Sequence, residues 1–343
     1  MKIGKKPEIN LRIILGIVFL STIMILSSSC KKPEKFTGPK EKVTIGVGSP
    51  ALAMPIIIAQ EKGFYSDEGL EVTLKRYPSG QKAMEAMFAE DVDIATVADT
   101  PIVLNSFIRN NFIVFATFVY SYDENKVLGR KDRGVSTPSD LKGKRIGIAE
   151  RTSSDFFAHV YLTEHLIDPS AVKLVDFTPT DLPGALEDGR VDAIVIFEPH
   201  AYKAMKALPG RVVRLPRSDL YRLSFNLAAM RSYAKGHPGL LKKILKAVDR
   251  GIMFIKQNKK ESIAVISRGL NLDENIFVRD DLVYELSLYH TLLTTFEDEA
   301  RWAITNRFTD KRKVPNYLDY LYLDAMKDVK PDAVTITKEV QTR

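Results

Sequence analysis

Hydroxyl, carboxyl and guanidinium side chains follow the ends of apolar segments in this 343-residue chain. Hydroxyls and backbone N–H groups at the start of a helix can hold a small anion, and a guanidinium strengthens such a site. A carboxylate in the same place favours an amine or N–H donor. The residues in these positions are Ser49, Ser79, Gly80, Asp99, Thr100, Arg151, Thr152, Ser153, Ser154 and Glu198. We expect them to contact a ligand; turn formation, helix capping and charge at a helix start are their alternative roles.

Catalytic and metal-binding patterns are weak by comparison. His159 and His165 are six residues apart, which does not place them on one helical face. His200 beside Glu198 is the one acid/base pair of note, and a surface or packing role is favoured over catalysis for it. The sequence shows neither a nucleophile elbow nor a phosphate-cradling glycine loop with lysine. We therefore expect no enzyme activity, no cofactor, no metal and no catalytic residues. The single cysteine, Cys30, excludes an internal disulfide framework.

Strand and helix signals alternate along the chain, which predicts an α/β protein with mostly parallel sheets. With about 300 residues in the folded part, two lobes are favoured over one core. The expected strands are Val43–Val47, Leu70–Leu74, Ile94–Ala98, Arg145–Ala149 and Val172–Phe177. The expected helices are Met54–Gln60, Gln81–Ala89, Ser154–Leu166 and Leu240–Lys256.

An internal repeat supports two equivalent lobes. Residues 86–93 read AMFAEDVD and residues 185–192 read ALEDGRVD, and each is followed by an apolar strand that ends in an acid, Asp99 or Glu198. Pro101 and Pro199 follow these acids, as expected at the first turn of a helix. Ligands of open α/β sheets bind at the carboxyl ends of strands, so the lobes are predicted to face each other across a cleft.

The net charge of +7 belongs mainly to the amino terminus. Residues 1–29 hold four basic residues against one acid, and residues 31–42 hold five lysines against two glutamates, which leaves +1 from Val43 onward. A nucleic-acid-binding face would need its positive charge within the folded domain. The chain is therefore not expected to bind nucleic acid.

The first 30 residues resemble a bacterial lipoprotein signal. A basic start precedes an apolar run over Ile13–Leu26, roughly 21 Å as a helix and short of the ~30 Å hydrocarbon core. Serines then lead to Cys30, the expected site of lipidation. Ser27 stands where such signals usually carry an aliphatic residue, so an uncleaved anchor and ordinary secretion stay open. Residues 30–42, rich in proline and charge, are predicted to be a flexible tether.

Several segments together resemble the substrate-binding proteins of ABC importers for nitrate, sulfonates, taurine and thiamine precursors. The resemblance runs from Val43 to Ile336. Its segments are KGFYSDEGLEVTL at 62–74, DVDIATVADTPIV at 91–103, DLKGKRIGI at 140–148, FEP at 197–199 and PNYLDYLYLDAMKDVKPDAVTI at 315–336. The family usually has Trp where this chain has Phe197.

The resemblance implies a type II periplasmic-binding-protein-like fold, in which two α/β lobes are joined by two crossover segments, expected near Asn125–Lys131 and Tyr221–Ala228. The lobes are expected at 43–126 with 226–343 and at 127–225, after a signal peptide over 1–29. A small polar solute would be captured between them by hinge closure. The implied partners are permease and ATPase subunits, with a monomeric protein held outside the cytoplasmic membrane by Cys30. An enzyme on the same scaffold, of thiamine-precursor or menaquinone type, and a ligand sensor for a membrane receptor are the alternatives.

Overall fold

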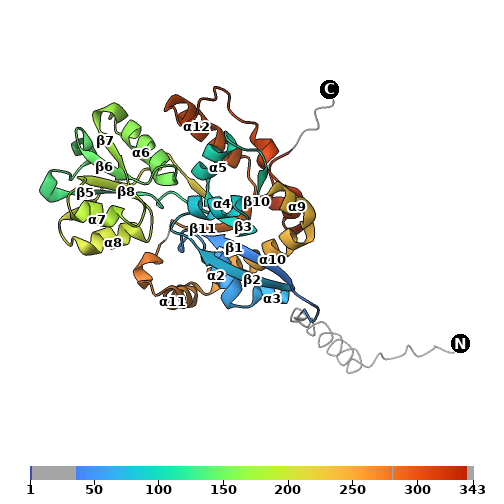
Figure 1. Cartoon of the computed structure of the whole chain (residues 1–343). Helices are drawn as coiled ribbons and strands as arrows, with labels where there is room; N and C mark the ends of the chain where they lie inside the picture. Colours follow the sequence, from blue (N-terminus) through green and yellow to red (C-terminus); the bar gives the residue numbers. More distant parts are fainter. Residues whose placement is uncertain (2–35, 280, 338–343) are drawn as a thin grey trace. The chain divides into compact units, whose positions relative to one another are not determined.

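The computed structural model describes residue 1, residues 36–279 and residues 281–337. Two β-sheets organise the unit that begins at Phe36, and each sheet has its own set of helices (Figure 1). We call the six-stranded sheet with its helices the first lobe and the five-stranded sheet with its helices the second lobe. This arrangement confirms the expected α/β class with two lobes.

The first lobe is built on six strands in the order β11-β4-β10-β3-β1-β2. Their bounds are β1 Glu41–Val47, β2 Leu70–Arg76, β3 Ile94–Ala98, β4 Phe112–Ser121, β10 Leu223–Met230 and β11 Val283–Ser287. Its helices are α2 Met54–Glu61, α3 Phe64–Asp67, α4 Gly80–Phe88, α5 Asp99–Ser106, α9 Arg231–Gly236, α10 Pro238–Gln257, α11 Lys259–Leu270, α12 Thr291–Thr305 and α13 Asp324–Val329.

The second lobe has five strands in the order β7-β6-β8-β5-β9. Their bounds are β5 Lys126–Arg130, β6 Arg145–Ile148, β7 Lys173–Asp176, β8 Ala193–Ile196 and β9 Val212–Arg214. Its helices are α6 Ser153–Glu164, α7 Leu182–Glu187 and α8 His200–Ala207, which are drawn in green and yellow-green around this sheet (Figure 1). Short 3₁₀ turns in the two lobes are η1 Lys131–Arg133, η2 Pro138–Leu141, η3 Pro169–Ala171, η4 Glu274–Ile276, η5 Tyr317–Tyr320 and η6 Pro331–Ala333.

The expectation of mostly parallel sheets is wrong. The pairs β1–β2, β1–β3, β6–β7 and β6–β8 are parallel, whereas β10 with β3 and β4, β11 with β4, and β5 with β8 and β9 are antiparallel. Strands β4, β5, β9 and β10, which take part in these antiparallel pairs, flank the two passages between the lobes. Parallel neighbouring strands need a connection, usually a helix, that brings the chain back to the edge of the sheet where the first strand began. The passages between the lobes contain no such helix, so the strands on either side of them can pair antiparallel.

The chain crosses between the lobes twice. The first passage lies between the end of β4 at Ser121 and the start of β5 at Lys126, and the second lies between Arg214 and Leu223. Residues 125–131 and 221–228, expected as the two crossovers, therefore mostly form β5 and β10.

The hydrophobic core is continuous from the first lobe into one face of the second sheet. It includes Ile45 and Ile94 of the first sheet and Ile146 and Val195 of the second. A separate cluster around Leu182 fills the other face of the second sheet. Since one core reaches across the passage, the two lobes are packed against each other in this structure.

The longest helix, α10, shows how packing constrains the sequence. Its buried residues recur three and four apart, as expected for an amphipathic helix. Gly251 lies where this helix crosses α2, and a Cβ there would be 2.5 Å from the Pro55 carbonyl oxygen. Glycine is therefore needed for the close approach of the two helices.

Candidate ligand-binding site

The carboxyl ends of the parallel strands place the predicted polar residues on facing edges. In the first lobe, Ser49 follows β1 and Ser79 follows β2. In the second lobe, Thr152 and Ser153 follow β6 at the start of α6. The short loops after these strands leave the side chains at the sheet edge, where α/β proteins bind ligands.

Residues of both lobes line one small cavity. The space is about 20 Å³, which is room for about one water molecule. Its walls are Ser49, Leu52, Ser79, Gly80, Gln81, Ala98, Pro101, Glu124, Thr152, Ser153, Phe197, Leu223 and Phe225. We call this space the cleft. Five predicted contact residues, Ser49, Ser79, Gly80, Thr152 and Ser153, thus lie together there, although their contact with a ligand remains a prediction.

Two helix starts from opposite lobes meet at the cleft. Ser79 caps α4 by accepting a hydrogen bond from the Lys82 backbone N–H at 3.3 Å. Thr152 caps α6 by accepting from the Ser154 N–H at 3.3 Å. The first N–H groups of a helix have no partner within the helix and carry a partial positive charge. The described lining contains no lysine or arginine, so these two helix starts are its source of positive potential.

Gly80 lets the backbone at the start of α4 approach the sheet. A Cβ at this position would be 2.9 Å from the Val97 Cα. The neighbouring loop is equally tight, because a Cβ at Gly48 would be 2.7 Å from the Gly80 backbone nitrogen. Two glycines therefore permit the turn that places Ser49 next to Ser79.

Glu124 is a cleft residue that the sequence did not reveal. Its Oε1 accepts from the Ser49 hydroxyl at 3.2 Å, and its Oε2 pairs with the Arg279 guanidinium at 2.5 Å. Arg279 also pairs with Asp281 at 2.6 Å. Burial raises the pKa of Glu124, while the adjacent positive charges oppose that rise. Nothing in the polar run that contains Glu124 marks it, since its partner lies 155 residues away.

Unpartnered polar atoms beside the cleft indicate a site made for a polar ligand. The Gln81 Oε1, which belongs to a lining residue, is buried without a hydrogen bond. The Asn125 Nδ2 is also buried and unpartnered, while the Oδ1 of the same side chain accepts from Ser153 at 3.3 Å. A buried polar group without a partner costs about 1–3 kcal/mol. An acceptor group of a ligand beside the Asn125 Nδ2 would remove the part of this cost that belongs to Asn125.

Asp99 and Glu198 lie near the cleft, but neither is among the residues that line it. Asp99 is fully buried and accepts from the Tyr221 hydroxyl and from the Ser224 N–H at 2.8 Å. The Glu198 carboxylate accepts from the Tyr202 N–H at 2.9 Å and pairs with Lys126 at 3.2 Å. Both carboxylates are occupied within the protein, so the expectation that acids of both lobes face the ligand does not fit their positions.

The remaining predicted residues have local roles. The Ser154 hydroxyl contacts the backbone of Ala149, accepting from its N–H at 3.2 Å. Thr100 is buried, and its Oγ1 has no hydrogen-bond partner. Arg151 adopts a φ of 61° in the turn before α6, and its N–H donates to Asp155 at 3.0 Å. None of the three is among the lining residues.

The acid/base pair proposed around His200 is not formed. The structure shows no hydrogen bond between the imidazole and Glu198, and the His200 Nδ1 is buried without a partner. Burial, with Lys203 nearby, lowers the pKa of His200 to about 4. His200 is therefore neutral at pH 7 and has no carboxylate to activate it.

Beneath the cleft, Asp99 and Glu299 of α12 form a buried acidic pair. Both side chains are 0% exposed. Burial raises the pKa of Glu299 well above its usual range, and the charge of Asp99 raises it further. The folded chain therefore holds the Glu299 proton more tightly than the unfolded chain does.

We expect the wild-type free energy of unfolding to fall as the pH rises from about 5 to 9. A raised carboxyl pKa adds stability that is complete below the unfolded value of about 4.3 and is lost as the pH rises through the folded pKa. Glu299→Gln should flatten this slope and make the protein more stable than wild type at pH 9. Urea unfolding across the pH range measures both, with Glu297→Gln, 46% exposed on the same helix, as the control. Parallel curves for wild type and Glu299→Gln would contradict the assignment.

Among the described residues, no cluster of three metal-ligating side chains occurs. Residues 36–279 and 281–337 also contain no helix with the length and apolar content needed to cross a membrane.

The chain is similar to several known proteins. Residues 52–262 match the family model described as NMT1/THI5 like. The putative aliphatic sulfonates-binding protein of Bacillus subtilis (strain 168) is 24% identical over 266 residues, covering 76% of this chain and 80% of that protein. The structure of the alkanesulfonate-binding protein SsuA from Xanthomonas axonopodis pv. citri bound to MOPS superposes with a TM-score of 0.73 at 16% identity, covering 84% of this chain and 100% of that one. The desulfurization enzyme DSZB also superposes, with a TM-score of 0.66 at 14% identity over 85% of this chain and 99% of its own.

Proposed function

Because this chain belongs to the NMT1/THI5-like family, we propose that it is a sulfonate-binding protein that delivers its ligand to an ABC importer outside the cytoplasmic membrane. The fold is that of the periplasmic binding proteins. Relatives named for sulfonate binding support the ligand class.

The observation that carries the proposal is the meeting of two helix starts at one cleft. Ser79 of the first lobe and Thr152 and Ser153 of the second line the cleft beside the first backbone N–H groups of α4 and α6. In this structure the Thr152 hydroxyl donates to the Ala149 carbonyl and the Ser153 hydroxyl to Asn125, so both would turn to the ligand when it binds. A sulfonate has three acceptor oxygens and one negative charge, so it can accept from both lobes at once. Glu124 does not oppose this anion as a lone charge would, because Arg279 pairs with it.

Contacts of one ligand with both lobes would drive closure of the hinge between them. A ligand that touches both lobes is bound more tightly when they are together, so it shifts the equilibrium towards the closed form. The cleft of about 20 Å³ is smaller than a sulfonate group. The lobes must therefore separate to admit the ligand and close less far around it than in this structure.

The enzyme alternative rests on the likeness to DSZB, which shows that this fold also supports catalysis. The unpaired, neutral His200 favours binding over catalysis here. A sensor that docks on a membrane receptor would bind its ligand in the same way, and a neighbouring permease and ATPase gene pair would favour the importer role.

Calorimetric titration of the purified protein tests the proposed function. We expect saturable binding of methanesulfonate, taurine or butane-1-sulfonate, and none of nitrate or a thiamine-precursor pyrimidine. At 100 times the Kd, the ligand should add about 2.7 kcal/mol to the free energy of unfolding, measured as a raised melting temperature. Turnover of a bound sulfonate would instead favour the enzyme, and the absence of any sulfonate binding would refute the proposal.

The anchoring segment is part of the same proposal. Cys30 and the apolar run before it lie outside the described residues. We propose a signal peptide over 1–29, a lipidated Cys30, a tether to residue 42, and lobes over 43–126 with 226–343 and over 127–225.

A Cys30→Ser protein is expected to leave the membrane fraction, because one thioether-linked lipid would be its attachment. Fractionation of cells and immunoblotting measure this, with the neighbouring Ser28→Ala as a control that should stay membrane-bound. Retention of Cys30→Ser in the membrane would show that another anchor holds the protein.

A further inference from the structure

A polar contact links helix α8 of the second lobe to the first lobe. The Tyr202 hydroxyl of α8 donates to the Asp273 Oδ2 at 2.6 Å, and the Lys206 Nζ lies 3.4 Å from the same oxygen. The Lys206 ammonium also lies over the Tyr202 ring, 5.7 Å from its centroid. Asp273 belongs to the first lobe, where it lies between α11 and η4. We call Tyr202, Lys206 and Asp273 the latch.

The Asp273 carboxylate is held in place for this contact by its own turn. Its other oxygen, Oδ1, accepts from the Asn275 backbone N–H at 3.1 Å and from the Asn275 side chain at 2.8 Å, which caps η4. The hydrogen bond from Tyr202, together with that cap, lowers the pKa of Asp273 to about 2. Asp273 is therefore ionised throughout the neutral range, and an ionised carboxylate is a strong hydrogen-bond acceptor.

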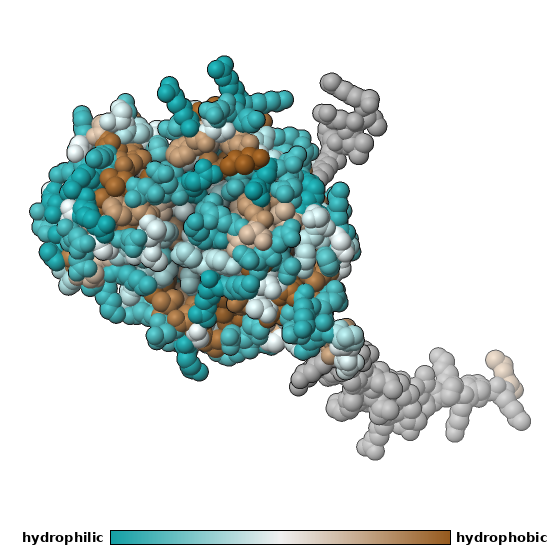
Figure 2. Space-filling view, in the orientation of Figure 1, coloured by the Kyte–Doolittle hydropathy of each residue, from teal (hydrophilic) through white to brown (hydrophobic). Residues whose placement is uncertain are grey.

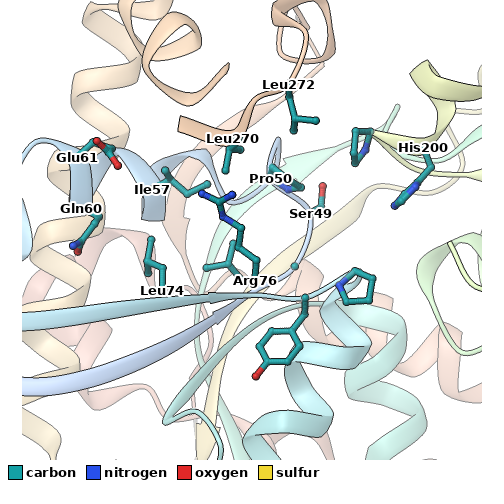
Figure 3. A pocket seen from close by; sticks show the side chains of 15 residues that line it. Ser49, Pro50, Ile57, Gln60, Glu61, Leu74, Arg76, His200, Leu270 and Leu272 are labelled. Carbon is teal, nitrogen blue, oxygen red and sulfur yellow. The ribbon is translucent and has the colours of Figure 1, made fainter. Parts of the chain in front are cut away.

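An open pocket lies between the start of α8 and the first lobe. Its volume is about 390 Å³, and Figure 3 shows Leu270 and Leu272 of the first lobe with His200 of α8 around it. Polar side chains also line the pocket, among them Gln60 and Glu61 of α2. On the face shown in Figure 2, hydrophobic surface is visible over α2 and α11, which border this pocket. Because α8 packs mainly against α7, β5 and β9 of its own lobe, the latch carries much of its attraction to the first lobe.

The latch is formed in a state that cannot hold the proposed ligand. The cleft of about 20 Å³ has room for about one water molecule, so a sulfonate group does not fit while the lobes are this close. Both contacts of the latch are nevertheless made here, the Tyr202 hydrogen bond at an ordinary length. The latch thus stabilises a closed form without ligand, and it competes with binding.

We propose that the latch is an autoinhibitory contact, which keeps the ligand-free protein closed and must break before the cleft admits a ligand. The effect on affinity rests on the proposed function, whereas the closed ligand-free form does not. The apparent affinity of a protein that binds only when open is reduced by the fraction that is open. A weaker latch should therefore give tighter binding, the opposite of what a clamp around the ligand would give.

Tyr202→Phe tests the latch, because it removes the donated hydrogen bond and keeps the ring. We expect the ligand-free variant to have a larger radius of gyration than wild type by small-angle X-ray scattering, because open lobes lie further apart. We also expect about fivefold tighter binding of methanesulfonate by calorimetry, since a hydrogen bond to a charged group favours the latched form by about tenfold when buried and by less at this partly exposed site.

A second variant at the other side of the contact repeats the test. Asp273→Asn removes the negative charge and keeps a side chain that can cap η4, so it should shift both measurements in the same direction as Tyr202→Phe. The two changes should not add in the double variant, because both act through one contact. Melting temperatures show that each variant is folded.

Tyr289→Phe is the matched control. The Tyr289 hydroxyl donates to Glu285 at 2.8 Å within the first lobe, so its removal should change neither the radius of gyration nor the affinity. Unchanged or weaker binding of methanesulfonate by Tyr202→Phe would overturn the inference, and so would an unchanged radius of gyration. If no protein in the series binds a sulfonate, the proposed function fails, and the scattering of the ligand-free proteins still decides whether the latch holds the lobes closed.

Discussion

Arg279→Met is expected to lower the free energy of unfolding by about 3–5 kcal/mol, the cost of leaving buried carboxylates without their cation. The Arg279 side chain is 7% exposed, and its two acidic partners, Glu124 and Asp281, are 1% and 9% exposed. Its Nη2 also donates to the Asp123 carbonyl at 3.0 Å. Removing it leaves the buried carboxylates of Glu124 and Asp281 without the cation they share, so the loss should far exceed that of an ordinary surface ion pair.

The decrease in the free energy of unfolding caused by Arg279→Met should depend on pH. Burial already raises the pKa of Glu124, and removing the opposing charge of Arg279 raises it further. A carboxyl with a raised folded pKa contributes stability that is present below its unfolded value and is lost as the pH rises through the folded one. The deficit of Arg279→Met should therefore be larger at pH 8 than at pH 5. Urea unfolding at the two values measures this difference.

Arg301→Met is the matched control. Arg301 also pairs with two carboxylates, those of Glu297 and Asp298, each at 2.8 Å. Its side chain is 57% exposed, however, so each pair is worth less than about 1 kcal/mol. Equal losses for Arg279→Met and Arg301→Met would show that burial does not govern the energy of the Glu124–Arg279 pair.

The double change Thr152→Ala with Ser153→Ala is expected to weaken sulfonate binding at least about 100-fold. Both hydroxyls line the cleft at the start of α6. A hydrogen bond to a charged group contributes about 1.5–3 kcal/mol, and two such bonds lost together exceed a hundredfold in Kd. Removing the Thr152 cap should also cost about 1 kcal/mol of stability. Calorimetric titration with methanesulfonate measures the affinity.

A second hydroxyl pair in the same lobe provides the control. Thr137 and Ser139 also stand at a helix start, where their side-chain oxygens lie 3.0 Å apart. They precede β6, at the opposite edge of the sheet from the cleft, and they are exposed. Thr137→Ala with Ser139→Ala should change stability but not affinity. If the two double variants bind methanesulfonate equally well, the helix start at Thr152 does not hold the ligand.

The order of elements could be predicted because each depends on its own residues. The buried run Ile94–Ala98 is strand β3 as expected, and Met54–Gln60 matches α2 to within one residue. The hydrophobic periodicity of these segments, and the turn residues that bound them, indicate the same element in any tertiary context. Strands β4 and β10 were not predicted. Both are almost wholly buried, so they lack the alternation that marks a half-exposed strand, and their antiparallel pairing depends on partners distant in the chain.

The sequence alone determined where the chain turns from strand to helix, and so which backbone segments reach the sheet edges. Ser49, Ser79, Gly80, Thr152 and Ser153 lie at the cleft for that reason. Only the tertiary structure decided which charged side chains face the cleft. Asp99 is turned to Tyr221, 122 residues away, while Glu124 is held by Arg279 from 155 residues away. A strand end fixes the position of a backbone, but the direction of a buried carboxylate follows its strongest hydrogen-bond donors, and folding alone brings those together.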